Sequence, residues 1–276
     1  MRVAIGIPTY NRRHLVELHA SSLRSSFLPP GTKVIVIDDA STEYDIAYLT
    51  SIYPDVCEIR RRSENSGGAS FAQRDLMEQL LATDADAVML LDSDLIVRQD
   101  FLTVGIDLLR DTDGVLSLFN TPNHPDIGVR GPFLIKEAIG CAGSLWRRGV
   151  AQTMLENVAS GPAFDWRFSE YLNGENIAIC VARHSLVQHI GFSQGQSHTF
   201  ESGDFGVGFG EADAHNAYRG IELLMSDSQA KARHTQSQIN AIIDQSAALE
   251  KRLERIERLL GIGLLRRAAG FVRRRK

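Results

Sequence analysis

The chain has 276 residues, 43% of them hydrophobic and 23% charged, which suits one large globular domain with an appendage. Its three cysteines, Cys57, Cys141 and Cys180, are widely spaced, so the sequence indicates neither a disulfide framework nor a thiolate metal site and fits a reducing compartment. The net charge of −4 is uneven, because residues 261–276 hold six cations and no acid and leave −10 for the rest. This acidic body argues against nucleic-acid binding, and no apolar run reaches the length of a membrane-spanning helix, about 18 residues.

The first part of the chain alternates between strand and helix patterns. Residues 3–8 and 33–39 are short apolar runs of the kind buried in a parallel sheet, and the periodicity between them predicts a helix over 14–26. Ser41 and Thr42 can cap the helix that follows. Further strands are predicted over 57–61, 87–94 and 114–119, with helices over 69–82 and 100–110. The alternation predicts an α/β fold with a mostly parallel, Rossmann-like sheet and helices on both faces.

The predicted strand over 87–94 ends in Asp92-Ser93-Asp94. Alternate strand residues point the same way, so both carboxylates are expected to face one crevice while Ser93 faces away. Open α/β sheets bind ligands at that carboxyl edge. Two carboxylates this close repel each other and lose hydration on burial, which a hard divalent cation would offset. The tripeptide alone also fits an acidic turn after a core strand.

Two common nucleotide-binding patterns are missing. Neither GxGxxG nor GxxxxGK[ST] follows the first strand, so a bound nucleotide is expected to be held by side chains and a metal. Four other segments, residues 7–12, 36–41, 65–69 with Arg74 beyond, and 92–94, resemble the motifs of family 2 glycosyltransferases in order and spacing. The resemblance implies the GT-A fold and an inverting transfer from a nucleotide sugar, most simply a UDP-sugar.

The resemblance also assigns site residues. Asp94 and Asp92 would bind Mn²⁺ or Mg²⁺, and His189 or His198 would complete the metal site, although a lone histidine is commonly structural. Arg74 would contact the nucleotide, its alternative being a solvated cation on a helix. The donor would be contacted by Pro8, Thr9, Tyr10, Asn11, Arg12, Asp38, Asp39, Arg74, Asp92 and Ser93.

Beyond residue 119 the parallel pattern fades. A strand is predicted over 133–145, a helix over 148–158 and a further strand over 177–181. The glycine-rich stretch 191–210 is long enough to form a lid over donor and acceptor, or simply a long loop.

The acceptor base is predicted on the helix that begins near Asp165. An acid there also favours the helix dipole, which is the structural alternative. In the resembled family an acidic residue at this point deprotonates the acceptor hydroxyl, often beside a second acid where this chain has Arg167. Asp165 is therefore the first candidate and Glu170 the second.

The C-terminal region differs in composition. Residues 239–260 have apolar positions at alternating spacings of three and four, which favours a coiled coil over a helix packed on the body. Residues 262–272 place apolar side chains opposite arginines, which suits an anionic membrane surface better than nucleic acid. The prediction is a catalytic domain over 1–225, a self-associating coiled coil over 228–260 and a membrane-associating tail over 261–276, on the inner face of the cell membrane in the cytoplasm.

Together these features predict a glycosyltransferase that acts on a hydroxyl of a glycan or glycolipid, as in bacterial-type surface polysaccharide synthesis. A sugar-phosphate nucleotidyltransferase is the first alternative, but it would carry a glycine- and arginine-rich loop where this chain has Pro8-Thr9-Tyr10-Asn11. A non-catalytic coiled-coil scaffold at a membrane is the second, and it would be expected to lose the acids at its strand ends.

Overall fold

The computed structural model describes residues 1–191 and 204–210, together with residues 235–236, 238–240, 243 and 246. The chain divides into two compact units, Met1–Leu223 and Leu224–Lys276. Most of the predicted coiled coil and all of the basic tail lie outside the described residues, as does the middle of the predicted lid. Within the described ranges, no helix has the length and apolar character needed to cross a membrane.

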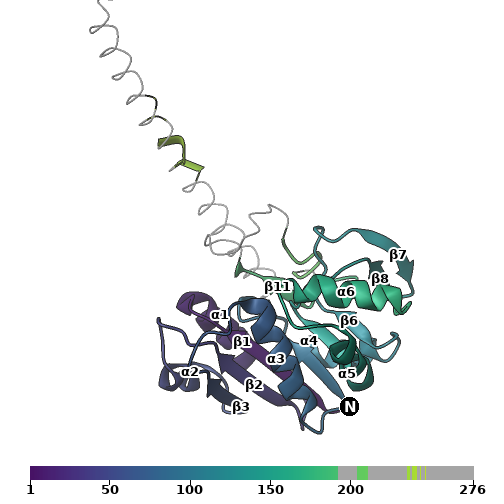
Figure 1. The fold of residues 1–276 in the computed structure, drawn as a ribbon, viewed down its shortest axis with the longest axis horizontal. Coiled ribbons are helices and arrows are strands. Elements are labelled where there is room, and N and C mark those ends of the chain that lie inside the picture. The colour runs from purple at the N-terminus through teal and green to yellow at the C-terminus, as the bar shows by residue number, and fades with distance from the viewer. Residues whose placement is uncertain (192–203, 211–234, 237, 241–242, 244–245, 247–276) are drawn as a thin grey trace, which may run out of the picture. The chain divides into compact units, whose positions relative to one another are not determined.

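The N-terminal half is a run of strand-helix units (Figure 1). Its elements are β1 (Val3–Thr9), α1 (Arg13–Arg24), β2 (Lys33–Asp38), α2 (Ile46–Ile52), β3 (Cys57–Arg61), α3 (Ala69–Leu81) and β4 (Ala87–Leu90). The four strands are parallel, in the spatial order β3-β2-β1-β4. The register pairs Thr9 with Asp38, so the carboxyl ends of β1 and β2 reach the same edge.

The second half extends this sheet with mixed strand directions. Its elements are β5 (Leu95–Val97), α4 (Phe101–Leu109), β6 (Val115–Ser117), β7 (Asp126–Arg130), β8 (Phe133–Lys136), β9 (Ser144–Arg147), α5 (Arg148–Asn157), α6 (Phe164–Gly174), β10 (Cys180–Ala182) and β11 (Val187–His189). The full order is β3-β2-β1-β4-β9-β6-β10-β8-β7, and β5 pairs with β11 in a separate two-stranded sheet. Only β9 and β8 run against the other strands of the nine-stranded sheet. The predicted α/β fold with a mostly parallel sheet is confirmed.

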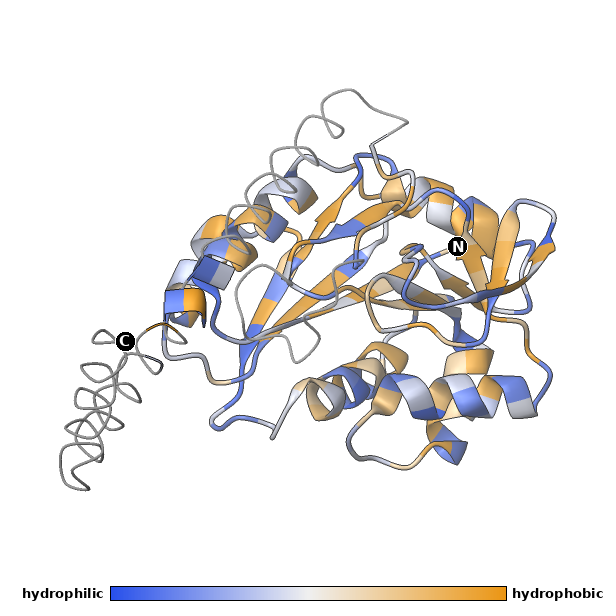
Figure 2. Cartoon of the chain, turned by 90° about the horizontal axis from the view of Figure 1, so that it is seen from above, coloured by the Kyte–Doolittle hydropathy of each residue, from blue (hydrophilic) through white to orange (hydrophobic). Residues whose placement is uncertain are grey.

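The sheet lies between two layers of helices, because alternate residues of each strand face opposite sides. In β1, Val3, Ile5 and Ile7 pack with α1, α2 and α4, whereas Ala4 packs in the second core beneath α3, α5 and α6. Figure 2 shows the apolar strands between these helices. Gly6 allows α3 to approach closely, since a Cβ there would lie 2.6 Å from Leu76 Cγ.

Three local predictions away from the end of β4 differ from the structure. The helix after β2 is capped by Asp45, which accepts a hydrogen bond from Tyr48 N at 2.8 Å, and not by Ser41 or Thr42. The single strand predicted over 133–145 is two strands, β8 and β9, separated by a loop that contains Gly143 at φ 71°. The strand predicted over 177–181 is shorter and later, as β10.

Candidate active site at the carboxyl edge of the sheet

A cavity of about 630 Å³ lies where β1, β2 and β4 end. Seven of the predicted donor-contacting residues line it, and so do all three predicted metal ligands, two sets that share Asp92. The lining consists of Pro8, Thr9, Tyr10, Arg12, Asp39, Asn65, Gly67, Gly68, Ala69, Ala72, Gln73, Asp92, Ser93, Asp94 and His189. The structure therefore gathers residues from five separate segments of the sequence at the carboxyl edge of the sheet. Open α/β sheets bind ligands at this position.

The two aspartates do not lie in the strand. β4 ends at Leu90, and Asp92, Ser93 and Asp94 occupy the turn that leads to β5. The strand alternation on which the orientation of Ser93 was predicted stops before Asp92, and all three residues line the cavity. The acidic turn and the ligand site are thus the same feature.

Asp94 is held by two cationic or potentially cationic neighbours. Arg12 Nη1 lies 2.9 Å from Asp94 Oδ2, and His189 Nε2 lies 3.4 Å from the same oxygen. On its other side, His189 Nδ1 lies 2.6 Å from Asp204 Oδ2. Asp92 accepts a separate hydrogen bond of 2.9 Å from Gln73 Nε2.

These contacts separate the pKa values of the two aspartates. Burial and the neighbouring Asp94 charge raise the pKa of Asp92 to about 6. Burial also acts to raise the pKa of Asp94, but His189 and Arg12 outweigh it and hold that pKa well below its usual range. Burial acts to lower the pKa of His189, but the carboxylates of Asp94 and Asp204 outweigh this effect and raise that pKa to about 10. Asp94 therefore lies between two groups of opposite charge, the Arg12 guanidinium and the His189 imidazole, whose raised pKa favours its protonated form.

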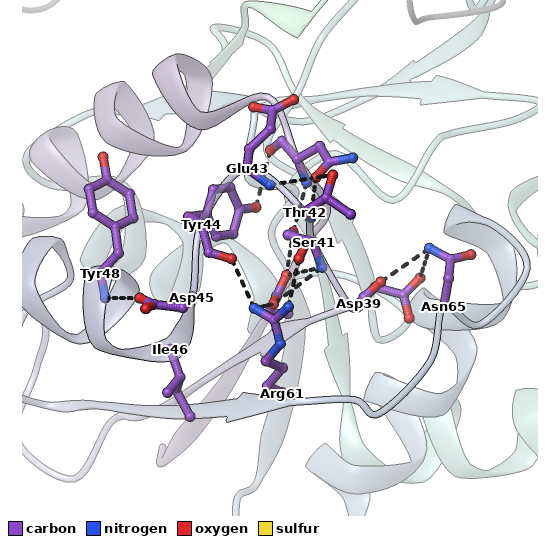
Figure 3. Close-up of polar contacts among 12 residues, drawn as sticks. Asp39, Ser41, Thr42, Glu43, Tyr44, Asp45, Ile46, Tyr48, Arg61 and Asn65 are labelled. Atoms are coloured by element: carbon purple, nitrogen blue, oxygen red, sulfur yellow. Dashed lines mark hydrogen bonds and ion pairs between the residues drawn. The ribbon is translucent and has the colours of Figure 1, made fainter.

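Asp39 forms the opposite side of the cavity. Its carboxylate accepts hydrogen bonds from Asn65 Nδ2 at 3.0 Å and from the Ser66 backbone N at 2.9 Å, and it forms an ion pair with Arg62 at 3.2 Å. Figure 3 shows the Asp39 carboxylate facing Asn65. The loop that contains Asn65 and Ser66 thus fixes the orientation of the buried Asp39 carboxylate at the cavity wall.

Asp38 is placed differently. It is fully buried, forms an ion pair with Arg61 at 2.8 Å and accepts hydrogen bonds from Ser41. Arg61 also donates to the carbonyls of Ser41 and Tyr44 (Figure 3). Of the two alternatives Asp38 and Asp39, only Asp39 lines the cavity.

Two further predicted donor residues are not brought to the cavity. Arg74 turns away from it and donates to the carbonyls of Val158 and, at 3.0 Å, Leu155, which lie at the end of α5. Asn11 uses its side-chain oxygen to accept from the backbone of Thr42 at 2.8 Å. Arg74 thus connects α3 to the end of α5, and Asn11 connects the segment after β1 to the loop after β2.

Asp165 lies in the first turn of α6, as predicted, and its Oδ1 accepts from the Trp166 backbone N at 3.0 Å. It is not part of the cavity wall. Burial raises the pKa of the Cys141 thiol, and the charges of both Asp92 and Asp165 raise it further, so both carboxylates lie within electrostatic range of Cys141. Glu170 is exposed and lies about 140° around the helix from Asp165, at 100° per residue.

The residues at Asp94 fit a divalent metal in part. Two ligands bound at right angles to an ion at about 2.1 Å lie about 3 Å apart, close to the 3.4 Å between Asp94 Oδ2 and His189 Nε2. Gly191 packs closely against these atoms, since a Cβ there would overlap Asp94 Oδ2 and lie 2.8 Å from His189 Nε2. In the part of the chain described, however, no three His, Cys, Asp or Glu side chains are grouped as a metal site.

The sequence patterns did not single out every residue of the site. Gln73 lies next to Arg74 in the chain, but adjacent residues of a helix point about 100° apart, so the motif that contains Arg74 says nothing of its neighbour. Asn65 and Ser66 belong to the motif segment 65–69, but that motif does not predict that they bind Asp39. Asp204 belongs to a glycine-rich stretch, and no local pattern links it to His189.

Comparison with known proteins assigns the family. A model of glycosyl transferase family 2 matches residues 4–149, which is more than half of the chain and includes β1 to β4 with Asp92 and Asp94. The chain belongs to glycosyl transferase family 2. It is therefore a glycosyltransferase, as predicted, and the nucleotidyltransferase and scaffold alternatives are not supported.

Solved structures share the fold of this glycosyltransferase. Residues 1–349 of S. aureus TarS match with a TM-score of 0.51 and 18% identity, covering 68% of this chain and 60% of that one. The same protein in complex with UDP-GlcNAc matches with a TM-score of 0.51 and 19% identity, over 68% and 58%. A Pyrobaculum calidifontis mannosyltransferase in complex with GDP-Man and Mn²⁺ matches with a TM-score of 0.49 and 17% identity, over 65% and 56%. The chain thus spans about 60% of the TarS chain it matches, and no curated protein matches it.

Proposed function

We propose that this glycosyltransferase transfers a sugar from a UDP-sugar to a hydroxyl of a glycan or glycolipid, with inversion at the anomeric carbon. The observation that carries the proposal is the cavity at the carboxyl edge, with Asp39 on one side and Asp92, Asp94 and His189 on the other. The crystal structure of TarS with UDP-GlcNAc, a protein of the same fold, agrees with a UDP-sugar donor.

In this proposal the two sides of the cavity have separate roles. Thr9, Tyr10 and Asp39 bind the nucleoside, and Asp39 is oriented for this by Asn65 and Ser66. The diphosphate lies toward Asp92 and Asp94. Asp94 and His189 would hold Mn²⁺ or Mg²⁺ with Asp92 nearby, and the ion would supply Lewis-acid stabilisation of the charge that develops on the leaving diphosphate.

Asp165 is proposed as the general base that takes the proton from the acceptor hydroxyl. The oxygen then attacks the anomeric carbon from the face opposite the diphosphate, so a single displacement inverts the configuration. The position of Asp165 in the first turn of α6 supports this role. Glu170 remains the second candidate.

The donor is tested by thermal unfolding with UDP-, GDP- and dTDP-sugars, each with and without added Mn²⁺. A ligand that binds only the folded state raises its melting temperature. Stabilisation by a UDP-sugar with Mn²⁺ is expected, and it should disappear in EDTA and in Asp94→Asn. If a UDP-sugar stabilises Asp94→Asn in EDTA as much as it stabilises the wild type with Mn²⁺, the metal role of Asp94 is overturned.

The C-terminal region is proposed to assemble the enzyme and to bind it to an anionic membrane surface, on the basis of its sequence pattern. Deleting residues 262–276 should abolish salt-sensitive binding to vesicles that contain phosphatidylglycerol, and the oligomer should persist. A monomer in light scattering of the intact chain would contradict the coiled coil.

A further inference from the structure

Arg12 and Asp94 both line the cavity, and they form an ion pair. Arg12 Nη1 lies 2.9 Å from Asp94 Oδ2, the same oxygen that His189 Nε2 approaches at 3.4 Å. The Asp94 side chain is 9% exposed and that of Arg12 is 27% exposed, so the ion pair is largely shielded from water. An interaction between such partly buried charges is screened much less than one at the surface.

The backbone beneath Arg12 is fixed. Asn11 N donates to Ser41 Oγ at 2.8 Å, Asn11 Oδ1 accepts from Thr42 N at 2.8 Å, and Tyr44 donates to the Asn11 carbonyl at 3.1 Å. Arg12 itself is the N-cap residue of α1, and its carbonyl accepts from Leu15 N at 2.9 Å. Both Asn11 and Arg12 have positive φ values, 49° and 55°. Any movement of the guanidinium must therefore occur by side-chain rotation from an anchored position.

A divalent ion held by Asp94 would compete with the Arg12 guanidinium, which already occupies Oδ2 of that carboxylate. Because both are cations, the ion would displace a charge-assisted hydrogen bond and would meet like-charge repulsion. A nucleoside diphosphate relieves this conflict, because its phosphate oxygens accept a guanidinium in a bidentate manner. Arg12 also lines the cavity, so its rotated side chain has space in which to meet that ligand.

We propose that Arg12 is the internal counter-cation of Asp94 in the empty site and moves to the donor diphosphate when a divalent ion takes its place. Arg12 thereby makes metal and nucleotide bind cooperatively. Cooperativity between two ligands is reciprocal: the factor by which UDP tightens metal binding equals the factor by which metal tightens UDP binding. Because this inference rests on the proposed donor site, its test measures the two ligands separately as well as together.

The experiment uses the full chain and Mn²⁺ with UDP as probes. The concentration of free Mn²⁺ is measured by its EPR signal, and UDP binding is measured by calorimetry. Each measurement is made with and without the other ligand. Arg12→Gln removes the competing charge, and Arg12→Lys keeps the charge but not the bidentate geometry. Arg13→Gln is the matched control, because Arg13 contacts Glu17 and the Tyr48 ring outside the cavity.

In the wild type and in Arg13→Gln, Mn²⁺ alone should bind weakly, and UDP should tighten it by about tenfold or more. In Arg12→Gln, Mn²⁺ alone should bind about tenfold more tightly than in the wild type, and UDP should bind more weakly than in the wild type when Mn²⁺ is present. The factor by which each ligand tightens the other should approach one. Arg12→Lys should lie between them.

Unchanged or weaker Mn²⁺ binding by Arg12→Gln in the absence of UDP overturns the role of Arg12, provided that the wild type binds UDP with Mn²⁺. If the wild type binds UDP in neither condition, the proposed donor site itself fails. Circular dichroism of each variant checks that it is folded, and Arg12→Lys decides the same question if Arg12→Gln does not fold.

Discussion

His189 Nδ1 lies 2.6 Å from Asp204 Oδ2, so the imidazole that faces Asp94 is oriented from behind by a second carboxylate. Such a carboxylate fixes the ring and makes its other nitrogen a better ligand, and its loss commonly lowers metal affinity by about ten- to a hundredfold. Asp204→Ala should therefore weaken Mn²⁺ binding in the presence of UDP by that factor, as measured by EPR.

The control for this prediction is Asp107→Ala, because Asp107 is exposed and paired with Arg110 on α4. It should leave Mn²⁺ affinity unchanged. Asp204→Asn keeps a hydrogen-bond acceptor and should lie between Asp204→Ala and the wild type. Wild-type affinity in Asp204→Ala would show that the contact does not support a metal ligand.

Asp165→Asn tests the proposed base. Asparagine retains the size and capping ability of aspartate, so stability and UDP-sugar affinity should change little. Turnover should fall by about a hundredfold or more, since a positioned base contributes that much to a step that moves a proton. The measurement is the rate of UDP release with the acceptor found by screening.

Glu170→Gln is the comparison for Asp165→Asn. It should retain near-normal turnover, because Glu170 is exposed on a different side of α6. An inactive Glu170→Gln beside an active Asp165→Asn would move the assignment to Glu170. Full activity in both variants would remove the base from the proposed mechanism.

Arg74→Met separates a structural role from a nucleotide-binding role. The variant keeps the aliphatic stem but leaves the carbonyls of Leu155 and Val158 without the guanidinium, which is expected to cost about 1–3 kcal/mol of unfolding free energy. UDP affinity should stay within about twofold. Urea denaturation and calorimetry measure the two quantities.

The control here is Arg110→Met, which removes an exposed arginine paired with Asp107 and should change stability by less than about 0.5 kcal/mol. If Arg74→Met is as stable as the wild type and loses UDP affinity, the motif resemblance assigns Arg74 correctly and the contacts with α5 are secondary.

His19 should make the fold sensitive to acid. It is fully buried, and its Nδ1 lies 2.7 Å from the Leu95 carbonyl oxygen. Burial lowers its pKa from 6.5 to about 4, so the unfolded chain takes up the proton first as the pH falls. Stability from this group is complete above pH 6.5 and is lost progressively down to pH 4, by about 3 kcal/mol.

Urea denaturation at several pH values measures this loss, and the difference between the wild type and His19→Gln isolates it from the carboxylates. His19→Gln should be less stable than the wild type at pH 7. Its free energy of unfolding should fall less steeply with decreasing pH, because the contribution of His19 is absent. His14→Gln, which replaces an exposed histidine, should follow the wild-type curve. Parallel curves for the wild type and His19→Gln would refute the prediction.

The sequence determined the framework of the site because that framework depends on local patterns. Apolar runs and helical periodicity are short-range properties, and they predicted β1 to β4 closely enough to place Thr9, Asp39 and Asp92 at one edge. The motifs in the same segments were sufficient to identify the family.

Tertiary structure alone decided which side chains face the cavity. Arg12 and Arg74 are both arginines in family motifs, yet Arg12 meets Asp94 whereas Arg74 binds the end of α5, because a long side chain turns toward partners supplied by other segments. Asp204 reaches His189 only through the folded chain, and β9 enters the sheet antiparallel between β4 and β6 by non-local pairing. Such contacts depend on residues distant in the sequence, and no local periodicity encodes them.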